Sequence, residues 1–135
     1  MTTHQNNIAM HLKDNLRKLS DQTYLILAIL WTGIILYLSL ISAQEAKNFN
    51  VWDIVGLDKL AHLVFYAGMT ILWSMALSRK QPEKKIILFF SISFGVLMEI
   101  CQLYLFNGRS FEIYDIVANV MGSLIGWILF KNLIN

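Results

Sequence analysis

The sequence has little of the chemistry that shapes soluble or secreted proteins. Among its 135 residues there are one cysteine and one proline, and charged residues make up 15%, against about 25% in an average soluble domain. A single cysteine excludes an intrachain disulfide framework, and the net charge of +2, scattered along the chain, gives no reason to expect nucleic acid as a partner. Hydrophobic residues reach 56%, which excludes a disordered chain and indicates a membrane protein.

Long uncharged runs account for most of the chain. The 23 residues between Asp21 and Glu45 carry no formal charge, which is about the length needed to cross a hydrocarbon core of roughly 30 Å. Apolar runs predict four transmembrane helices, at residues 22–43, 57–78, 86–106 and 113–130. We therefore expect one all-α domain over residues 22–135, an integral membrane four-helix bundle.

A polar segment, residues 1–21, precedes the first predicted span. Its apolar residues Ile8, Leu12, Leu16 and Leu19 recur at helical spacing, while its basic residues fall largely elsewhere on the helical wheel. This pattern is typical of an amphipathic helix that lies on a membrane surface. A solvated, frayed terminus on the cytoplasmic side is the alternative.

The distribution of lysine and arginine predicts the orientation of the chain. If the N-terminus is cytoplasmic, eight basic residues fall on the cytoplasmic side and three, Lys47, Lys59 and Arg109, on the outer side. By the positive-inside rule, we expect both termini in the cytoplasm.

Polar residues inside the predicted spans gather near one side of the membrane. In this topology they occupy the outer ends of the second, third and fourth spans and one outer loop: Asp58, Lys59, His62, Glu99, Gln102, Arg109, Asp115 and Asn119. An ionisable side chain in hydrocarbon costs at least about 2.5 kcal/mol, so this cluster is a candidate binding site. The structural alternative is that these groups pair with one another and only hold the helices together.

Small residues in the last span predict close helix packing. Gly122 and Gly126 are four residues apart and follow Asp115 and Asn119 on the same helical face. Such spacing lets a neighbouring transmembrane helix approach closely. We therefore expect the last span to pack tightly just below its polar residues.

The polar residues belong to motifs that resemble a known family. In chain order they are Asp58-Lys59-Leu60-Ala61-His62, Glu99-Ile100-Cys101-Gln102, Gly108-Arg109-Ser110-Phe111, and Asp115-Ile116-Val117-Ala118-Asn119 followed by Gly122. This ordered set resembles the VanZ-like family of small bacterial membrane proteins. The resemblance implies a multi-pass protein of the bacterial cytoplasmic membrane, in a family named for a member linked to resistance to the glycopeptide teicoplanin. It implies an effect on antibiotic susceptibility but no particular reaction.

Three classes of function fit the cluster. The first is a binding site in which Lys59 and Arg109 face the phosphate of an envelope lipid or a lipid-linked precursor, while the carboxylates hold both cations in place. The second is an enzyme that acts on such a lipid, with His62 as general base. The third is a structural or proton-relay component of a larger envelope complex, in which Glu99 and His62 carry the proton and the chain forms an oligomer.

A metal centre is a further alternative for the same residues. His62 with the carboxylates of three helices supplies enough ligands, but two nearby cations argue against a metal ion. We therefore expect no metal and no other cofactor. The expected partners are membrane lipids.

Overall fold

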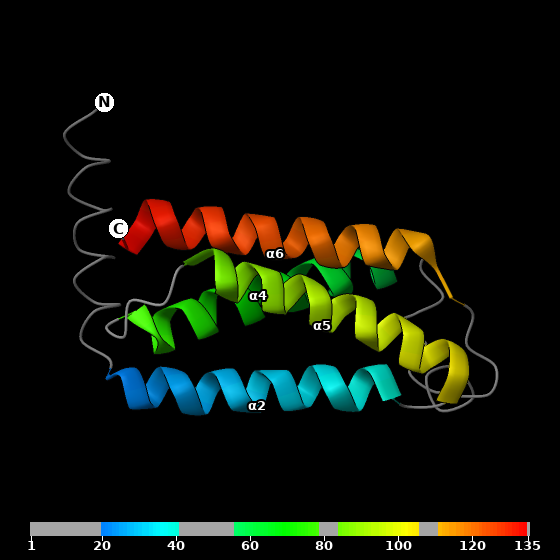
Figure 1. The fold of residues 1–135 in the computed structure, drawn as a ribbon, viewed down its shortest axis with the longest axis horizontal. Coiled ribbons are helices and arrows are strands. Elements are labelled where there is room, and N and C mark those ends of the chain that lie inside the picture. Colours follow the sequence, from blue (N-terminus) through cyan, green and yellow to red (C-terminus); the bar gives the residue numbers. More distant parts are fainter. Residues whose placement is uncertain (1–19, 41–55, 79–83, 106–110, 135) are drawn as a thin grey trace.

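The computed structural model describes residues 20–40, 56–78, 84–105 and 111–134, and these form four helices. They are α2 (Asp21–Leu40), α4 (Leu57–Ala76), α5 (Lys84–Leu105) and α6 (Ile113–Ile134). Successive helices run in opposite directions, so the ends of α2 and α5 and the starts of α4 and α6 lie at one end of the bundle (Figure 1). The predicted all-α fold with four helices is confirmed. The predicted amphipathic segment and the loop with Arg109 lie outside the described residues.

Three of these helices are long and apolar enough to cross a membrane. The apolar stretches are Asp21–Leu40, Lys85–Tyr104 and Ile113–Asn132. Helix α4 is of similar length, but its first two turns contain two charged residues and a histidine. Large apolar side chains such as Ile26 on α2 and Phe89 on α5 are exposed on the outside of the bundle, as expected for surfaces that face lipid hydrocarbon.

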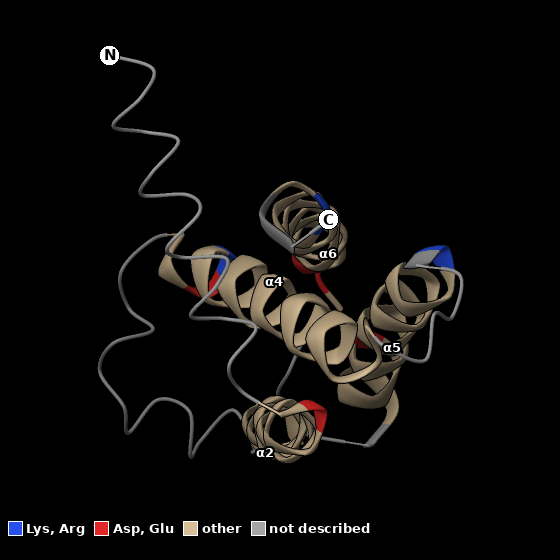
Figure 2. Cartoon of the chain, turned by 90° about the vertical axis from the view of Figure 1, so that its left-hand side faces the viewer, with Lys and Arg blue, Asp and Glu red and all other residues tan. Residues whose placement is uncertain are grey.

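Helix α4 is the inner helix of the bundle. It contacts α2, α5 and α6, and in a view along the bundle it passes between α2 and α6, inclined to both (Figure 2). Tyr66 and Met69 of α4 pack with Ile35 of α2 in one apolar cluster. A second cluster joins α4 to α2 and α6 through Tyr24, Met75, Ala76 and Phe130. Helix α4 packs against the other three helices, and its polar first turns contact α6.

Helix α6 rests on α4 through two glycines. A Cβ atom on Gly122 would lie 2.2 Å from the carbonyl oxygen of Leu63, and one on Gly126 would lie 2.4 Å from that of Ala67. No side chain fits at these distances, so only glycine permits this backbone contact. The contact aligns the first turns of α4 with the first turns of α6 and thereby positions the polar residues of both.

Helix α2 is attached to α4 by different means. Ser20 caps its start, since the Ser20 hydroxyl accepts a hydrogen bond from the backbone N–H of Thr23 at 3.2 Å. Further along, the indole N–H of Trp31 donates to the carbonyl oxygen of Phe65 at 2.9 Å. Trp73 of α4 donates in return to the hydroxyl of Thr32 at 3.0 Å. These bonds join two helices whose facing surfaces are otherwise apolar.

Candidate functional site

Polar side chains of three helices meet at one end of the bundle. We call this the polar end and define it by the residues Asp58, Lys59, His62, Glu99, Glu112, Asp115 and Asn119. Glu99 and Asn119 are 0% and 1% exposed, and Asp115 is 6% exposed. The side chains of Lys59 and Glu112 are 30% and 43% exposed. The polar end therefore has a buried floor, formed by Glu99, Asp115 and Asn119, and an accessible rim, formed by Lys59 and Glu112.

Lys59 is the central cation of the rim. Its Nζ atom forms ion pairs with carboxylates of Asp58 and Glu112, and it lies 3.0 Å from Oδ1 of Asp115. An ammonium group has three protons, so these three carboxylates can engage all of them. Lys59, Asp58 and Asp115 are predicted members of the cluster, whereas Glu112 is not among the predicted residues. Its position three residues before Asp115, at the start of α6, was the available signal.

His62 and Asn119 join α4 to α6 on the floor. Nδ1 of His62 lies 2.9 Å from the amide oxygen Oδ1 of Asn119. Nε2 of the same ring lies 3.6 Å from Oδ2 of Asp115. Asp115 is thus shared: one carboxylate oxygen faces Lys59 and the other faces His62.

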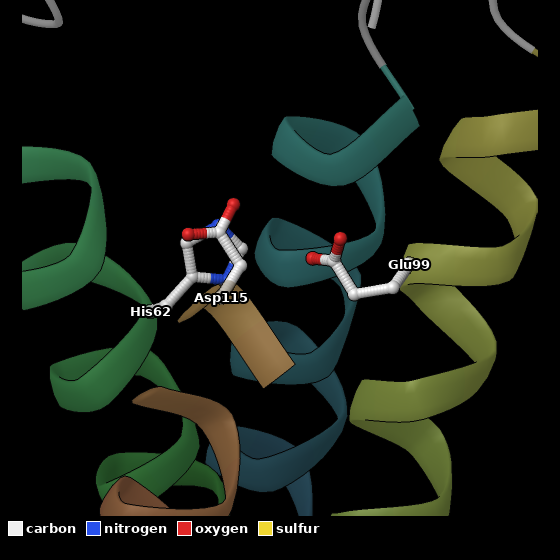
Figure 3. A group of neighbouring side chains, drawn as sticks. All are labelled: His62, Glu99 and Asp115. Carbon is white, nitrogen blue, oxygen red and sulfur yellow. The ribbon is translucent and has the colours of Figure 1, made fainter. Parts of the chain in front are cut away.

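Glu99 brings α5 into the same group. One ligand atom each from His62, Glu99 and Asp115 can be chosen so that all three lie within 4.8 Å of one another. His62 points from α4, Glu99 from α5 and Asp115 from α6, and the three side chains face one another (Figure 3). Gly95, one turn before Glu99, allows this approach, since a Cβ atom there would lie 3.0 Å from Cβ of Asn119.

One predicted site residue, Gln102, lies elsewhere, and another, Arg109, is outside the described residues. Gln102 is buried, but its side-chain N–H donates to the backbone carbonyl of Ser39 on α2 at 3.0 Å. It therefore joins α5 to α2.

Polar groups continue from the floor into the bundle. The hydroxyl of Thr70 donates to that of Ser91 at 2.8 Å, and Ser91 is hydrogen-bonded to Ser123 at 2.8 Å. These three buried hydroxyls come from α4, α5 and α6 and were not among the predicted site residues. Between them and the floor, Tyr66 is 1% exposed, and its hydroxyl has no hydrogen-bond partner within the part of the chain that the structure describes.

An apolar pocket of about 380 Å³ lies in the other half of the bundle. It is bounded by α2, α4 and α5, with Thr32, Met69, Trp73, Phe90 and Phe94 among its lining residues. The pocket offers almost no polar surface and none of the ionisable residues. The chemistry of the chain is therefore concentrated at the polar end.

The polar end has an excess of negative charge. Among the described residues, four carboxylates (Asp58, Glu99, Glu112 and Asp115) are grouped with a single ammonium, that of Lys59. Carboxylates so close together repel one another unless cations or protons compensate them. Any ligand of this site must be compatible with that excess.

Comparison with protein families gives one match. The family described as VanZ/LLP1 matches residues 13–135, which include all four helices and the whole polar end. No curated protein and no solved structure matches the chain.

Proposed function

Because the chain belongs to the VanZ/LLP1 family of multi-pass membrane proteins, we propose that its polar end binds the phosphate of an anionic envelope lipid. The observation that carries this proposal is the arrangement of a buried floor beneath an accessible rim. Lys59 stands at that rim, within reach of water and of lipid headgroups. A lysine held by carboxylates at the end of a bundle is a suitable point charge for a phosphate.

Phosphate binding requires one of the three carboxylates to release Lys59. Glu112 is the most exposed of them, at 43%, whereas Asp115 is 9% exposed in its side chain. A rim ion pair contributes little to stability because water solvates both groups well. We therefore assign Glu112 as the group that gives way when the phosphate arrives.

The negative excess also calls for a second positive group. Arg109, which the sequence places between α5 and α6, is the proposed partner of Lys59. The guanidinium group can hold two phosphate oxygens at once, which an ammonium group cannot. Lys59 and Arg109 together would attract a phosphate that carboxylates alone would repel, although four carboxylates still outnumber these two cations.

Headgroup chemistry provides the direct test. Purified full-length protein in detergent is mixed with phosphatidic acid or with diacylglycerol of the same acyl chains, and bound lipid is counted by native mass spectrometry. The two lipids differ only in the phosphate. We expect a preference for phosphatidic acid that falls about tenfold in Lys59→Gln, because a charged hydrogen bond is lost.

Two further variants complete this experiment. Lys131→Gln removes the same charge at the opposite end of α6, where Lys131 is exposed, and should leave the preference unchanged. Glu112→Gln frees a proton of Lys59 and should strengthen phosphatidic acid binding. Equal binding of both lipids by the wild-type protein would contradict the proposal.

The proposed orientation places the polar end at the outer face of the bacterial cytoplasmic membrane. Eight basic residues against three support this through the positive-inside rule. In a Cys101→Ser background, a cysteine at Asn107 should react with an impermeant reagent added outside intact cells, and a cysteine at Gln81 should not. The reverse pattern would place the polar end in the cytoplasm and remove outer-leaflet lipids as its ligands.

An enzyme is the second candidate, and one contact favours it. Asn119 holds Nδ1 of His62, as the group that orients a general base would, and Nε2 lies 3.6 Å from Oδ2 of Asp115. If His62 acts in this way, incubated lipid phosphates are converted, and His62→Gln abolishes the conversion. Recovery of intact lipid after incubation with the wild-type protein would contradict the enzyme candidate, and lipid binding would be the remaining proposal.

A further inference from the structure

We propose that His62, Glu99 and Asp115 form a binding site for a divalent transition-metal ion such as Zn²⁺. One ligand atom from each of these residues lies within 4.8 Å of the other two. They come from three different helices and point toward a common centre (Figure 3). One imidazole nitrogen and two carboxylate oxygens are a ligand set that zinc accepts, with an open position left for water or a substrate oxygen.

The hydrogen bond between His62 and Asn119 orients the ring for this role. The Asn119 oxygen can only accept, so the proton of a neutral imidazole lies on Nδ1 and the lone pair lies on Nε2. That lone pair faces Oδ2 of Asp115 at 3.6 Å. In that tautomer both atoms are acceptors, and a cation between them would relieve their repulsion. Histidine ligands of metals are commonly fixed in this way by a hydrogen bond at the second nitrogen.

The distances fit a metal ion after a small adjustment. Ligand atoms at about 2.1 Å from a tetrahedral ion are about 3.4 Å apart, and the His62 and Asp115 atoms are already at 3.6 Å. The widest separation in the group is 4.8 Å or less. An inward movement of Glu99 by a rotamer adjustment would bring it to bonding distance.

Lys59 does not occupy this centre. It lies on the Oδ1 side of Asp115, among the carboxylates of Asp58 and Glu112. That second group of carboxylates is also close enough to hold an ion, but the ammonium group already fills it. No metal was expected because cations are near, but the structure places the described cation, Lys59, on the other side of the shared carboxylate.

The choice of metal follows from the donor atoms. Ca²⁺ and Mg²⁺ bind through oxygen ligands, and the half-buried imidazole of His62 is a nitrogen donor that they do not favour. Zn²⁺ and Mn²⁺ accept mixed nitrogen and carboxylate sites. A double positive charge would also offset most of the negative excess at the polar end. This inference goes beyond lipid binding and does not depend on it, since the metal alone is the probe.

The test is a titration of the chelator-treated full-length protein in detergent with ZnCl₂. Isothermal calorimetry should give one tight site per chain, and the melting temperature should rise with Zn²⁺ because the ion binds the folded state. Glu99→Gln and His62→Gln should lose at least tenfold in affinity together with the thermal shift. Asn119→Ala, which removes only the orienting hydrogen bond, should lose about 10- to 100-fold.

A matched control tests whether Zn²⁺ binding needs these three ligands or only the negative charge of the chain. Asp21→Asn removes a carboxylate from the first turn of α2, at the opposite end of the bundle, and it should keep the wild-type Zn²⁺ affinity. Equal losses in Asp21→Asn and Glu99→Gln would overturn the proposal, as would a wild-type protein that binds no Zn²⁺. Zn²⁺ binding to the Arg109→Ala variant but not to the wild-type protein would also overturn the proposal. The three residues would then be partners of Arg109 and not metal ligands.

Discussion

Helices α6 and α2 both pack on α4, but in opposite ways. Helix α6 touches the backbone of α4 at Gly122 and Gly126 and adds buried ionic and hydrogen-bonded contacts at the polar end. Helix α2 packs through large side chains, with two indole hydrogen bonds between the helices. The first interface depends on a narrow geometry and the second on bulk apolar contact.

This difference indicates where precision is needed. A glycine contact leaves little freedom in the spacing of α4 and α6, so the distance between His62 and Asn119 is set by the backbone. An interface of large side chains can adjust its rotamers with a small loss of stability. The described ionisable groups of the bundle interior lie on the α4, α5 and α6 side. We therefore regard these three helices as the carriers of the function and α2 as the helix that covers them.

The largest expected effect is the loss of the shared carboxylate. Asp115→Ala leaves Lys59 without its buried partner and removes the group opposite His62. Breaking a buried ion pair costs about 3–5 kcal/mol because the remaining charge stays desolvated. Glu112→Ala, at the exposed rim, should cost less than about 1 kcal/mol. Equilibrium unfolding in mixed micelles measures the loss of unfolding free energy in both variants. Similar losses would mean that burial does not make Asp115 more important for stability than Glu112.

A slightly smaller effect is expected at the glycine contact. In Gly122→Ala the new methyl group meets the Leu63 carbonyl, which cannot move aside by side-chain rotation. Overpacking costs about 1–3 kcal/mol, and we expect the upper end of that range. Gly33 on α2 is the matched control, since a Cβ atom there would meet nothing within 4 Å. Gly33→Ala should leave stability unchanged or raise it by up to about 1 kcal/mol. A loss in Gly33→Ala equal to that in Gly122→Ala would remove the contrast between the interfaces.

The attachment of α2 should be the least sensitive to substitution. Trp73→Phe keeps an aromatic ring but loses the hydrogen bond to Thr32, at a cost of about 1 kcal/mol. Trp127→Phe is its counterpart on α6, where the buried indole N–H has no hydrogen-bond partner among the described residues. That substitution should cost less. Thermal unfolding of both variants compares them, and a larger loss in Trp127→Phe would show that the indole of Trp73 does not secure α2.

Much of this architecture could be predicted from the sequence. The helix positions follow from uncharged runs, because a bilayer excludes charge over a fixed length. The convergence of His62, Glu99 and Asn119 follows from counting helical turns, since each lies at a similar distance from its helix end. Gly122 and Gly126 were singled out by their spacing, and the structure places both against the α4 backbone.

Other contacts could not be predicted because they depend on how each helix is rotated. Gln102 shares a motif with Glu99, yet it faces Ser39 of α2. Thr70, Ser91 and Ser123 form a buried chain of hydroxyls, but such residues are common in membrane helices and can bond to their own backbone. The Thr70 hydroxyl is near both kinds of partner, since it also lies 2.9 Å from the carbonyl oxygen of Tyr66, and its single proton can be donated to only one of them at a time.

The measurement that tests the central claim most directly separates ligand binding from stability at Arg109. Arg109→Lys keeps the charge and loses the two-pronged hydrogen bonding that suits a phosphate. Arg79→Lys makes the same change at a residue that the sequence places between α4 and α5. Phosphatidic acid binding by native mass spectrometry and thermal unfolding are measured for both variants. We predict that only Arg109→Lys weakens lipid binding and that both variants unfold like the wild type. A marked loss of stability in Arg109→Lys with lipid binding intact would contradict the account and make Arg109 a structural residue.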